Sequence, residues 1–210
     1  MPTRTATVTD LNDLSRQDRR RAKTRNQLLQ AAKRLLATKG FHGTKIADIA
    51  AAADVGTGTF YLYFPTKDAL FADLVRETAL AAKEAMDAAR ASITEPRERA
   101  RIGGATFFRF AAENRDVFKI LFGHSAQFDE LLREVHQIFI ADIEEDFAAG
   151  AAAGVFHANL PPAFAAQAIV GMLTQVVSWW LEHQEISIED ITTMTHRMLT
   201  QGTTVQGEHQ

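Results

Sequence analysis

The chain has 210 residues, of which 46% are hydrophobic and 23% are charged, and its formal net charge is −3. This composition supports a folded core and excludes a largely disordered chain. There is no cysteine, which excludes disulfides, thiolate metal sites and cysteine nucleophiles. The first residues are polar, and the most apolar window, residues 163–181, contains Gln, Thr and Ser. We therefore expect a cytoplasmic protein without a membrane span.

The charges are unevenly divided along the chain. Residues 1–70 carry 12 Lys and Arg against 6 Asp and Glu, whereas residues 71–210 carry 11 against 20. Such a division indicates a polyanion-binding N-terminal domain on an acidic body. Chance sorting of surface charge is the alternative.

Residues 1–17 are polar and predict a mobile arm. From Asp18 onward a helical period begins, and Gly40 supplies a stop signal for that helix. Thr44 is positioned to cap a second helix, whose apolar residues Ile46 and Ile49 recur at helical spacing. The exposed N–H groups of that second helix predict a phosphate site.

The stretch "ADVGTGTFYLYFPTKDAL" at residues 53–70 allows three interpretations: a phosphate-binding glycine loop, a buried strand or a short helix. A dinucleotide loop needs a preceding strand and a third glycine, which "GTGTFY" lacks. A five-residue strand would have no partner strand. A helix starting near Thr57 buries Phe60 and Phe64 together, and with the preceding helix it makes a helix-turn-helix.

The remaining sequence also has helical periodicity. We predict helices at about 67–92, 95–114, 115–123, 126–149, 161–183 and 187–200. The fold class is therefore all-α, with about nine helices. The expected domains are a helix-turn-helix domain at 18–65, a helical body at 66–203 and a disordered tail at 204–210.

The segment "LLQAAKRLLATKGFHGTKIADIAAAADVGTGTFYLYFPTKDALF" resembles the N-terminal DNA-binding domain of the TetR family of bacterial regulators. The resemblance covers about 45 residues and involves about a dozen spaced positions within them. Two positions depart from the family pattern. Asp54 stands where glycine is usual in the turn, and Asp tolerates a left-handed conformation better than most residues. Gly56 replaces the usual Ser or Thr cap and leaves one N–H without a side-chain partner.

A helix-turn-helix inserts the N-terminal end of its recognition helix into the major groove. Gly58 would allow close backbone approach, and the hydroxyls and methyls of Thr57 and Thr59 can meet base edges. The resemblance places phosphate contacts at Tyr61, Tyr63 and Lys67. The "RRRAKTR" run is either a solvated face or an extension of these contacts. The predicted DNA-binding residues are Thr44, Lys45, Thr57, Gly58, Thr59, Tyr61, Tyr63, Lys67, Arg21 and Arg25.

The expected partners are double-stranded DNA with a palindromic operator and a second copy of the chain. "PPAFAAQAIVGMLTQVVSWWLEH" is apolar almost all round, which indicates a helix buried on several sides. The resemblance implies a four-helix interface from the last two helices of each subunit, and a monomer core is the alternative. The predicted interface residues are Phe164, Ala168, Met172, Val176, Trp180, Ile191, Met194 and Met198.

The middle of the chain is rich in phenylalanine. These rings either fill the core or, as the resemblance implies, enclose a pocket for a small hydrophobic effector. A fatty acyl compound and a drug-like aromatic are the candidate ligand classes. The predicted pocket residues are Phe107, Phe110, Arg115, Phe118, Phe122, His124, Phe139, Gln175 and Trp179.

An enzyme is the main alternative class. Di-metal helical bundles use Glu-x-x-His pairs, and no histidine here has Asp or Glu three or four residues away. HExxH, nucleophile-elbow and P-loop motifs are also missing from the sequence. We therefore expect no catalysis, no cofactor and no metal. An effector-independent architectural DNA-binding protein and a transcriptional activator remain as alternatives to a repressor.

Overall fold

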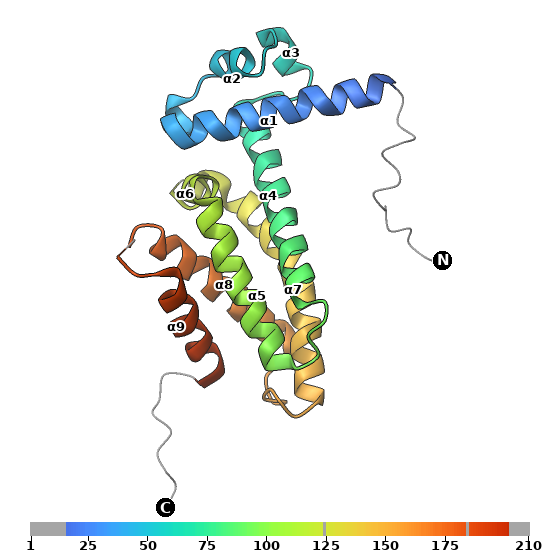
Figure 1. Ribbon diagram of the computed structural model, residues 1–210, viewed down its shortest axis with the longest axis vertical. Helices are drawn as coiled ribbons and strands as arrows, with labels where there is room; N and C mark the ends of the chain where they lie inside the picture. Colours follow the sequence, from blue (N-terminus) through green and yellow to red (C-terminus); the bar gives the residue numbers. More distant parts are fainter. Residues whose placement is uncertain (1–15, 124, 184, 202–210) are drawn as a thin grey trace, which may run out of the picture. The chain divides into compact units, whose positions relative to one another are not determined.

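The structure is a computed structural model that describes residues 16–123, 125–183 and 185–201. Nine α-helices and no strand occur within these ranges, which confirms the all-α prediction (Figure 1). The helices are α1 (Arg16–Gly43), α2 (Ile46–Ala52), α3 (Thr57–Tyr61), α4 (Lys67–Arg90), α5 (Pro96–Glu113), α6 (Arg115–Gly123), α7 (Ser125–Ala152), α8 (Pro162–Trp180) and α9 (Ile188–Gln201). Arg16 and Gln17, predicted as part of the arm, already belong to α1. Residues 1–15, the predicted tail and His124 lie outside the described residues.

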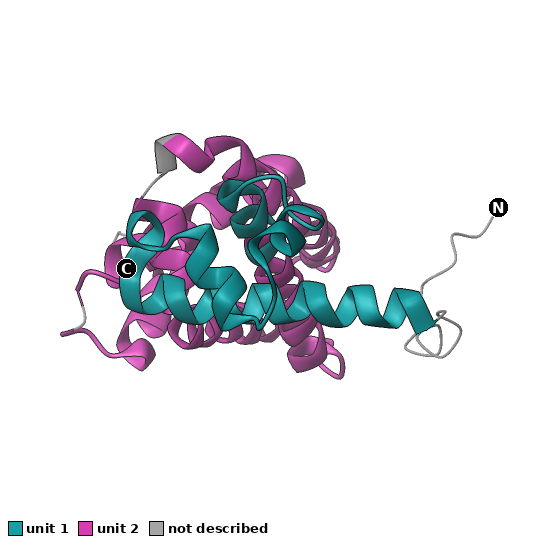
Figure 2. Ribbon diagram, turned by 90° about the horizontal axis from the view of Figure 1, so that it is seen from above, with its two compact units in different colours: residues 1–74 teal, residues 75–210 magenta. Residues whose placement is uncertain are grey.

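The chain divides into two compact units, Met1–Leu74 and Val75–Gln210 (Figure 2). We call the described part of the first unit the head and that of the second unit the body. Helix α4 has residues in both, since its first eight residues, 67–74, belong to the head.

Two backbone positions shape the head. At Gly40, φ is 69° and ψ is 176°, a conformation open mainly to glycine, and it breaks the regular course of α1. Phe41 then turns inward and its ring contacts Phe71 edge-on at 5.4 Å between centroids. After α2, Asp54 has φ 55°, so the predicted left-handed turn is confirmed.

The turn after α2 is a Schellman motif. The Val55 N–H donates to the Ala50 carbonyl at 3.0 Å, and the Asp54 N–H donates to the Ala51 carbonyl at 3.1 Å. Helix α3 follows at once, with Gly56 at the N-cap and no side-chain capping bond, as the sequence predicts. Helix α4 is capped by Thr66, whose hydroxyl accepts from the Ala69 N–H at 3.0 Å.

The body is a bundle in which α7 packs against α8, and α5 packs against α7 and α9 (Figure 1). Glu95 caps α5 by accepting from the N–H groups of Arg97 and Glu98, and Pro96 occupies the first turn. The main apolar core joins α4, α5, α8 and α9 through Met86, Phe108, Val177 and Trp180 among others. Gly154 has φ 72° and ends α7 in a second Schellman motif.

Candidate DNA-binding surface and effector cavities

Helix α3 has a buried side and an exposed tip. Phe60 and Phe64 are fully or almost fully buried, with ring centroids 5.8 Å apart, and they hold the helix on the head. Thr57 and Gly58 are exposed, and Tyr61 is 53% exposed. A Cβ added at Gly58 would meet nothing within 4 Å, so protein packing does not require glycine there. The tip is therefore free to approach another molecule.

Four other predicted DNA contacts differ in how far they are exposed on the head. Lys45 and Arg21 are exposed, while Thr59 and Tyr63 are half-buried. All of these residues retain an accessible portion.

Thr44 requires a correction. Its side chain is buried, and its hydroxyl donates to the Gly40 carbonyl at 2.8 Å. The N-cap of α2 is Lys45, which makes no side-chain capping bond. Thr44 thus satisfies a carbonyl at the end of α1 instead of capping α2, because the turn at Gly40 leaves that carbonyl without a helical partner.

Lys67 and Arg25 are also engaged within the head. Lys67 Nζ donates to the carbonyls of Phe41 at 2.5 Å and Thr44 at 2.9 Å, and it lies 4.3 Å from the centroid of the Phe41 ring. Arg25 pairs with Asp73 at 2.7 Å. Two of the three N–H donors of Lys67 Nζ are thus bound by backbone carbonyls of the head, and its predicted phosphate contact stays a prediction.

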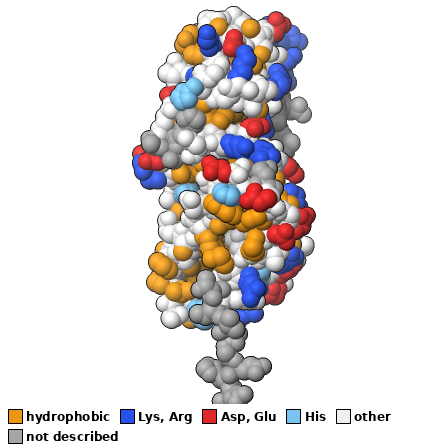
Figure 3. Space-filling view, turned by 90° about the vertical axis from the view of Figure 1, so that its left-hand side faces the viewer, with side chains coloured by type: hydrophobic (Ala, Val, Ile, Leu, Met, Phe, Trp, Pro, Cys, Tyr) orange, Lys and Arg blue, Asp and Glu red, His pale blue; other side chains and the backbone are white. Residues whose placement is uncertain are grey.

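Helix α8 presents an apolar face to solvent. The exposed positions Phe164, Ala168, Gly171, Gln175 and Trp179 recur at helical spacing and form one stripe. Phe164 is 61% exposed and Trp179 is 43% exposed. Helix α9 adds the exposed side chains of Met194 and Met198. Figure 3 shows hydrophobic side chains gathered over the lower half of the face that carries α9.

Four residues of α8 and α9 lie on the side opposite to the predicted one: two predicted interface residues are buried, and two predicted pocket residues are exposed. Trp180 and Ile191, predicted at the interface, are buried in the body's own core, and Trp180 Nε1 donates to the Ile186 carbonyl at 2.9 Å. Gln175 and Trp179, predicted in the pocket, lie on the exposed stripe. Met172 and Val176 are half-buried. An evenly apolar helix gives no signal for which face turns inward, so sequence reasoning chose the wrong phase.

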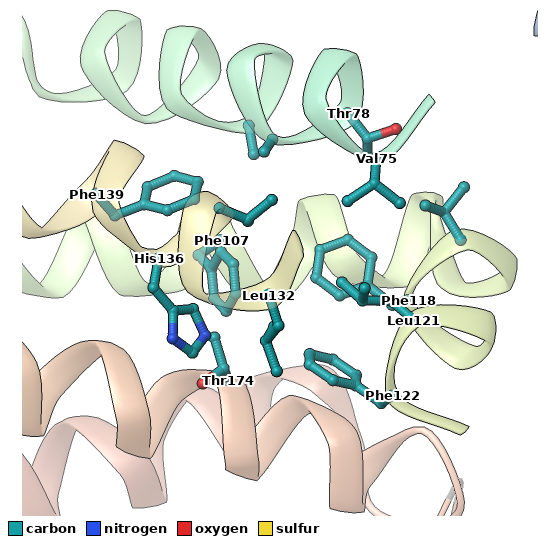
Figure 4. A pocket seen from close by; sticks show the side chains of 14 residues that line it. Val75, Thr78, Phe107, Phe118, Leu121, Phe122, Leu132, His136, Phe139 and Thr174 are labelled. Atoms are coloured by element: carbon teal, nitrogen blue, oxygen red, sulfur yellow. The ribbon is translucent and has the colours of Figure 1, made fainter. Parts of the chain in front are cut away.

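The body encloses a small cavity of about 40 Å³ among α4, α5, α6, α7 and α8 (Figure 4). Four predicted residues line it: Phe107, Phe118, Phe122 and Phe139. The half-buried Phe110 and Arg115 do not. A water molecule fits in such a volume, but an organic effector does not. The phenylalanines therefore mainly fill the core, which was the alternative interpretation of the sequence.

His136 lines the same cavity and was not among the predicted pocket residues. Its Nε2 is buried and has no hydrogen-bond partner among the described residues. Burial lowers the pKa of His136 below its usual value. The imidazole is thus held in its neutral form more strongly than an exposed histidine.

A larger cavity, of about 260 Å³, lies elsewhere in the body. Helices α4, α5, α7, α8 and α9 line it, and no prediction from the sequence placed a cavity there. Its polar wall contains Arg90, Arg99 and Asp146, and its apolar wall includes Phe147 and Phe164. We call it the chamber. The one available sequence signal was the spacing of charged residues on α4 and α7, which places several of them at i, i+3 and i+4.

An ionic network adjoins the chamber. Arg90 is 6% exposed and bridges Asp87 at 2.6 Å and Asp146 at 2.8 Å. Burial alone would raise the pKa of Asp87, but hydrogen bonds from Lys83 and Arg90 outweigh burial and hold that pKa below its usual value. Lys83 also pairs with Asp142 on α7. The network therefore fastens the second half of α4 to α7 through charged groups.

Known proteins match this chain over nearly all of its length. Residues 28–74 match the family described as bacterial regulatory proteins, tetR family, and residues 94–203 match the description tetracyclin repressor-like, C-terminal domain. A Bacillus subtilis (strain 168) relative, the uncharacterized HTH-type transcriptional regulator YdgC, is 24% identical over 192 residues, which cover 87% of this chain and 96% of the relative.

Two solved structures have the same fold. The fatty acid degradation regulator FadR from Bacillus halodurans is 24% identical, with a TM-score of 0.75 over 85% of this chain and 95% of that protein. FadR from Bacillus subtilis, solved in complex with stearoyl-CoA, is 20% identical, with a TM-score of 0.75 over 85% of this chain and 98% of that protein. With the helix-turn-helix of the head and the two family matches together, the chain belongs to the TetR family of helix-turn-helix, DNA-binding transcriptional regulators.

Proposed function

We propose that this protein is a cytoplasmic repressor that binds a palindromic operator as a homodimer and is released by a small hydrophobic effector. The single observation that carries the proposal is the exposed tip of α3 at Thr57 and Gly58, held on the head by the buried Phe60 and Phe64. A short rod with a polar, glycine-containing end suits entry into a major groove about 12 Å wide.

Base reading is assigned to Thr57, Gly58 and Thr59. Phosphate contacts are assigned to Tyr61, Tyr63, Lys45 and Arg21, whose side chains retain exposed portions. The logarithm of the DNA affinity should fall linearly with the logarithm of the salt concentration, and each neutralised phosphate should make this slope more negative by ~0.9. Thr44, Lys67 and Arg25 are left out of this set as direct side-chain contacts because their polar groups are bound within the head.

The homodimer is assigned to the exposed stripe of α8 together with α9. By length and composition α8 is apolar enough to cross a membrane, and core helices of globular proteins share this property. In the body, 33% of the apolar window of α8 is buried. A second copy would cover the remaining apolar surface. Ala168 and Gly171 permit close helix approach, while Phe164 and Trp179 supply large contact areas. Two heads would then meet successive major grooves, ~34–36 Å apart.

The effector is assigned to the body. FadR from Bacillus subtilis was solved with stearoyl-CoA, and that supports a fatty acyl class of ligand for this fold. A drug-like aromatic is the second class. To act as an inducer, the ligand must favour the state that does not fit the operator by ~1–3 kcal/mol.

Selection of bound DNA from a random pool tests the proposal. We expect enrichment of an inverted repeat, and we expect acyl compounds to release it from the protein. A pool without any enriched sequence would overturn specific regulation and favour an architectural DNA-binding role. Enrichment that no small molecule reverses would overturn the effector part alone.

A further inference from the structure

The chamber has the size of a ligand site for a small organic molecule. Its volume is about 260 Å³. An apolar protein cavity of ~150 Å³ already binds benzene, and pockets for drug-sized ligands start at ~300 Å³. The 40 Å³ cavity among the phenylalanines is far below both values. Among the cavities described here, the chamber is therefore the one with room for an organic ligand without rearrangement.

Two glycines of α5 shape the inner wall. A Cβ added at Gly104 would meet nothing within 4 Å, so this position leaves space in the chamber. A Cβ added at Gly103 would approach Arg90 Cδ to 3.3 Å, so the Arg90 stem lies directly against Gly103. Glycine is a poor helix former. The pair keeps the chamber open and sets the position of the arginine.

The polar wall offers more donors than acceptors. Both oxygens of Asp146 already accept, one from Arg90 Nη1 at 2.8 Å and the other from Arg99 Nη2 at 2.9 Å. Arg90 Nη2 donates to Asp87 at 2.6 Å. Arg90 Nε has no hydrogen-bond partner among the described residues, although the side chain is almost fully buried. A buried donor without an acceptor is unfavourable, and a ligand oxygen nearby would relieve it.

The rest of the lining is mostly apolar. Phe147, Phe156, Leu160 and Phe164 surround the space. Leu160 and Phe164 mark its outer rim, and Phe164 also belongs to the stripe of α8 that is proposed to contact a second copy. An apolar enclosure with a few polar groups at one wall is the usual composition of small-molecule sites. The lining thus suits a molecule with an apolar body and one polar end.

We infer that the chamber binds a small amphipathic molecule: an apolar chain or ring that carries one carbonyl or carboxylate oxygen directed at Arg90. The inference rests on the proposed function, because it names the chemistry and the place of the effector. Arg90 is the last residue of α4, the one helix among those described that has residues in both head and body. A ligand oxygen bound to Arg90 would alter the ion pair between Arg90 and Asp146, which fastens α4 to α7.

Calorimetric titration of the full chain with three probes, each built on an eight-carbon chain, tests this inference. Octanoate and methyl octanoate carry an acceptor, and octylamine carries a donor on the same tail. We expect both acceptors to bind at least ~10-fold more tightly than octylamine. Tighter binding of octanoate than of its ester would assign a carboxylate, and equal binding would assign a carbonyl. Octylamine binding as tightly as octanoate, or no binding by any probe, would overturn the inference.

Two substitutions at one position provide a matched control. Gly104→Phe should fill the chamber and weaken every probe at least ~10-fold, whereas Gly104→Ala should stay within ~3-fold of the wild type. Both replace a helical glycine with a better helix former, and alanine favours the helix more than phenylalanine does. Unchanged probe affinity in Gly104→Phe, with its cooperative thermal unfolding intact, would place the ligand elsewhere.

Arg90→Lys keeps the charge but removes Nε and the planar fork. It should reduce the preference for octanoate over octylamine, and an unchanged preference would remove Arg90 from the site. Operator selection on the same preparations separates the two proposals. Enriched DNA without probe binding would refute ligand binding in the chamber and leave the proposed DNA-binding function standing. Probe binding without enriched DNA would refute the proposed DNA-binding function and leave ligand binding in the chamber standing.

Discussion

Two pairs of adjacent aromatic residues show how the head and the body differ. In the head, Phe60 is fully buried while its neighbour Tyr61 is 53% exposed; in the body, Trp180 is 7% exposed and Trp179 is 43% exposed. Each pair has one ring in the core and one at the surface. The head exposes a phenol beside threonines and a glycine, and the body exposes an indole in an apolar stripe. The head thus leaves a surface suited to nucleic acid, and the body leaves one suited to protein.

The body pair gives the largest expected contrast. Trp180→Ala should lower the free energy of unfolding by ~3–5 kcal/mol, because it empties a core position and also removes the bond from Nε1 to the Ile186 carbonyl. Trp179→Ala should lower the unfolding free energy of the monomer by no more than ~1 kcal/mol. It should instead raise the dimer dissociation constant ~30-fold or more, as the loss of an interface anchor does.

Denaturant unfolding and analytical ultracentrifugation measure these two quantities. Ala88→Leu, on an exposed position of α4, serves as the control and should alter neither. If Trp179→Ala left the dimer intact while Trp180→Ala dissociated it, the exposed stripe would not be the interface.

The aromatic pair of the head should show the same contrast between its buried and its exposed residue. Phe60→Ala should cost ~3–4 kcal/mol of unfolding free energy, whereas Tyr61→Phe should stay within ~0.5 kcal/mol of the wild type. Tyr61→Phe should still weaken operator binding several-fold, since it removes a hydroxyl proposed to contact phosphate. Fluorescence anisotropy with labelled operator checks the affinity. Wild-type affinity in Tyr61→Phe would remove this residue from the contact set.

His136 should make the body sensitive to acid. Because burial lowers its pKa in the folded state, the unfolded state binds the proton more readily. Its contribution to stability is therefore present above the unfolded pKa of ~6.5 and is lost as the pH falls through the window between that value and the lowered folded value. His196 shifts in the same direction through burial and Arg101 and adds to the effect.

Unfolding experiments at pH 7.5 and 5.5 measure this dependence. His136→Gln should lose part of the pH dependence, while His42→Gln, at an exposed position of the head, should retain all of it. Equal pH dependence in the wild type and His136→Gln would show that this imidazole is not the sensitive group.

Asp54 gives the smallest expected effect. It holds φ 55° at the C′ position of a Schellman motif, where glycine is the usual residue. Asp54→Gly should raise the unfolding free energy by ~0.5–1 kcal/mol, because it relieves the left-handed strain of a residue with a Cβ. Asp54→Ala should not stabilise, since alanine keeps the Cβ. Thermal unfolding of both variants gives the comparison, and stabilisation by alanine would contradict the strain argument.

The same two pairs show what could be predicted from the sequence. The phase of α3 was predicted correctly, because glycines, a turn residue and the pair Phe60 and Phe64 leave one way to bury a five-residue helix. The phase of α8 was not, because apolar residues occur on every side of it and either tryptophan could face inward. The order of the helices and their approximate bounds could be predicted from apolar periodicity and from capping and turn residues.

The polar contacts were the hardest to predict. The positions of Thr44 and Lys67 depend on where the carbonyls at the end of α1 lie, which is decided by the turn at Gly40 and not by local sequence. The chamber depends likewise on five helices that approach only in the folded body. The spacing of charged residues on α4 and α7 is the only trace that this long-range geometry leaves in the sequence.

The central claim is that the tip of α3 reads DNA bases while Tyr61 only positions the protein on the backbone. The most direct test is random-pool selection with the wild type, Thr57→Val and Tyr61→Phe. Thr57→Val keeps the shape but loses the hydroxyl, so it should change the preferred base at one symmetry-related pair of positions. Tyr61→Phe should retain the preferred sequence and bind it more weakly. An identical preferred sequence in all three proteins, or none in any, would contradict the account.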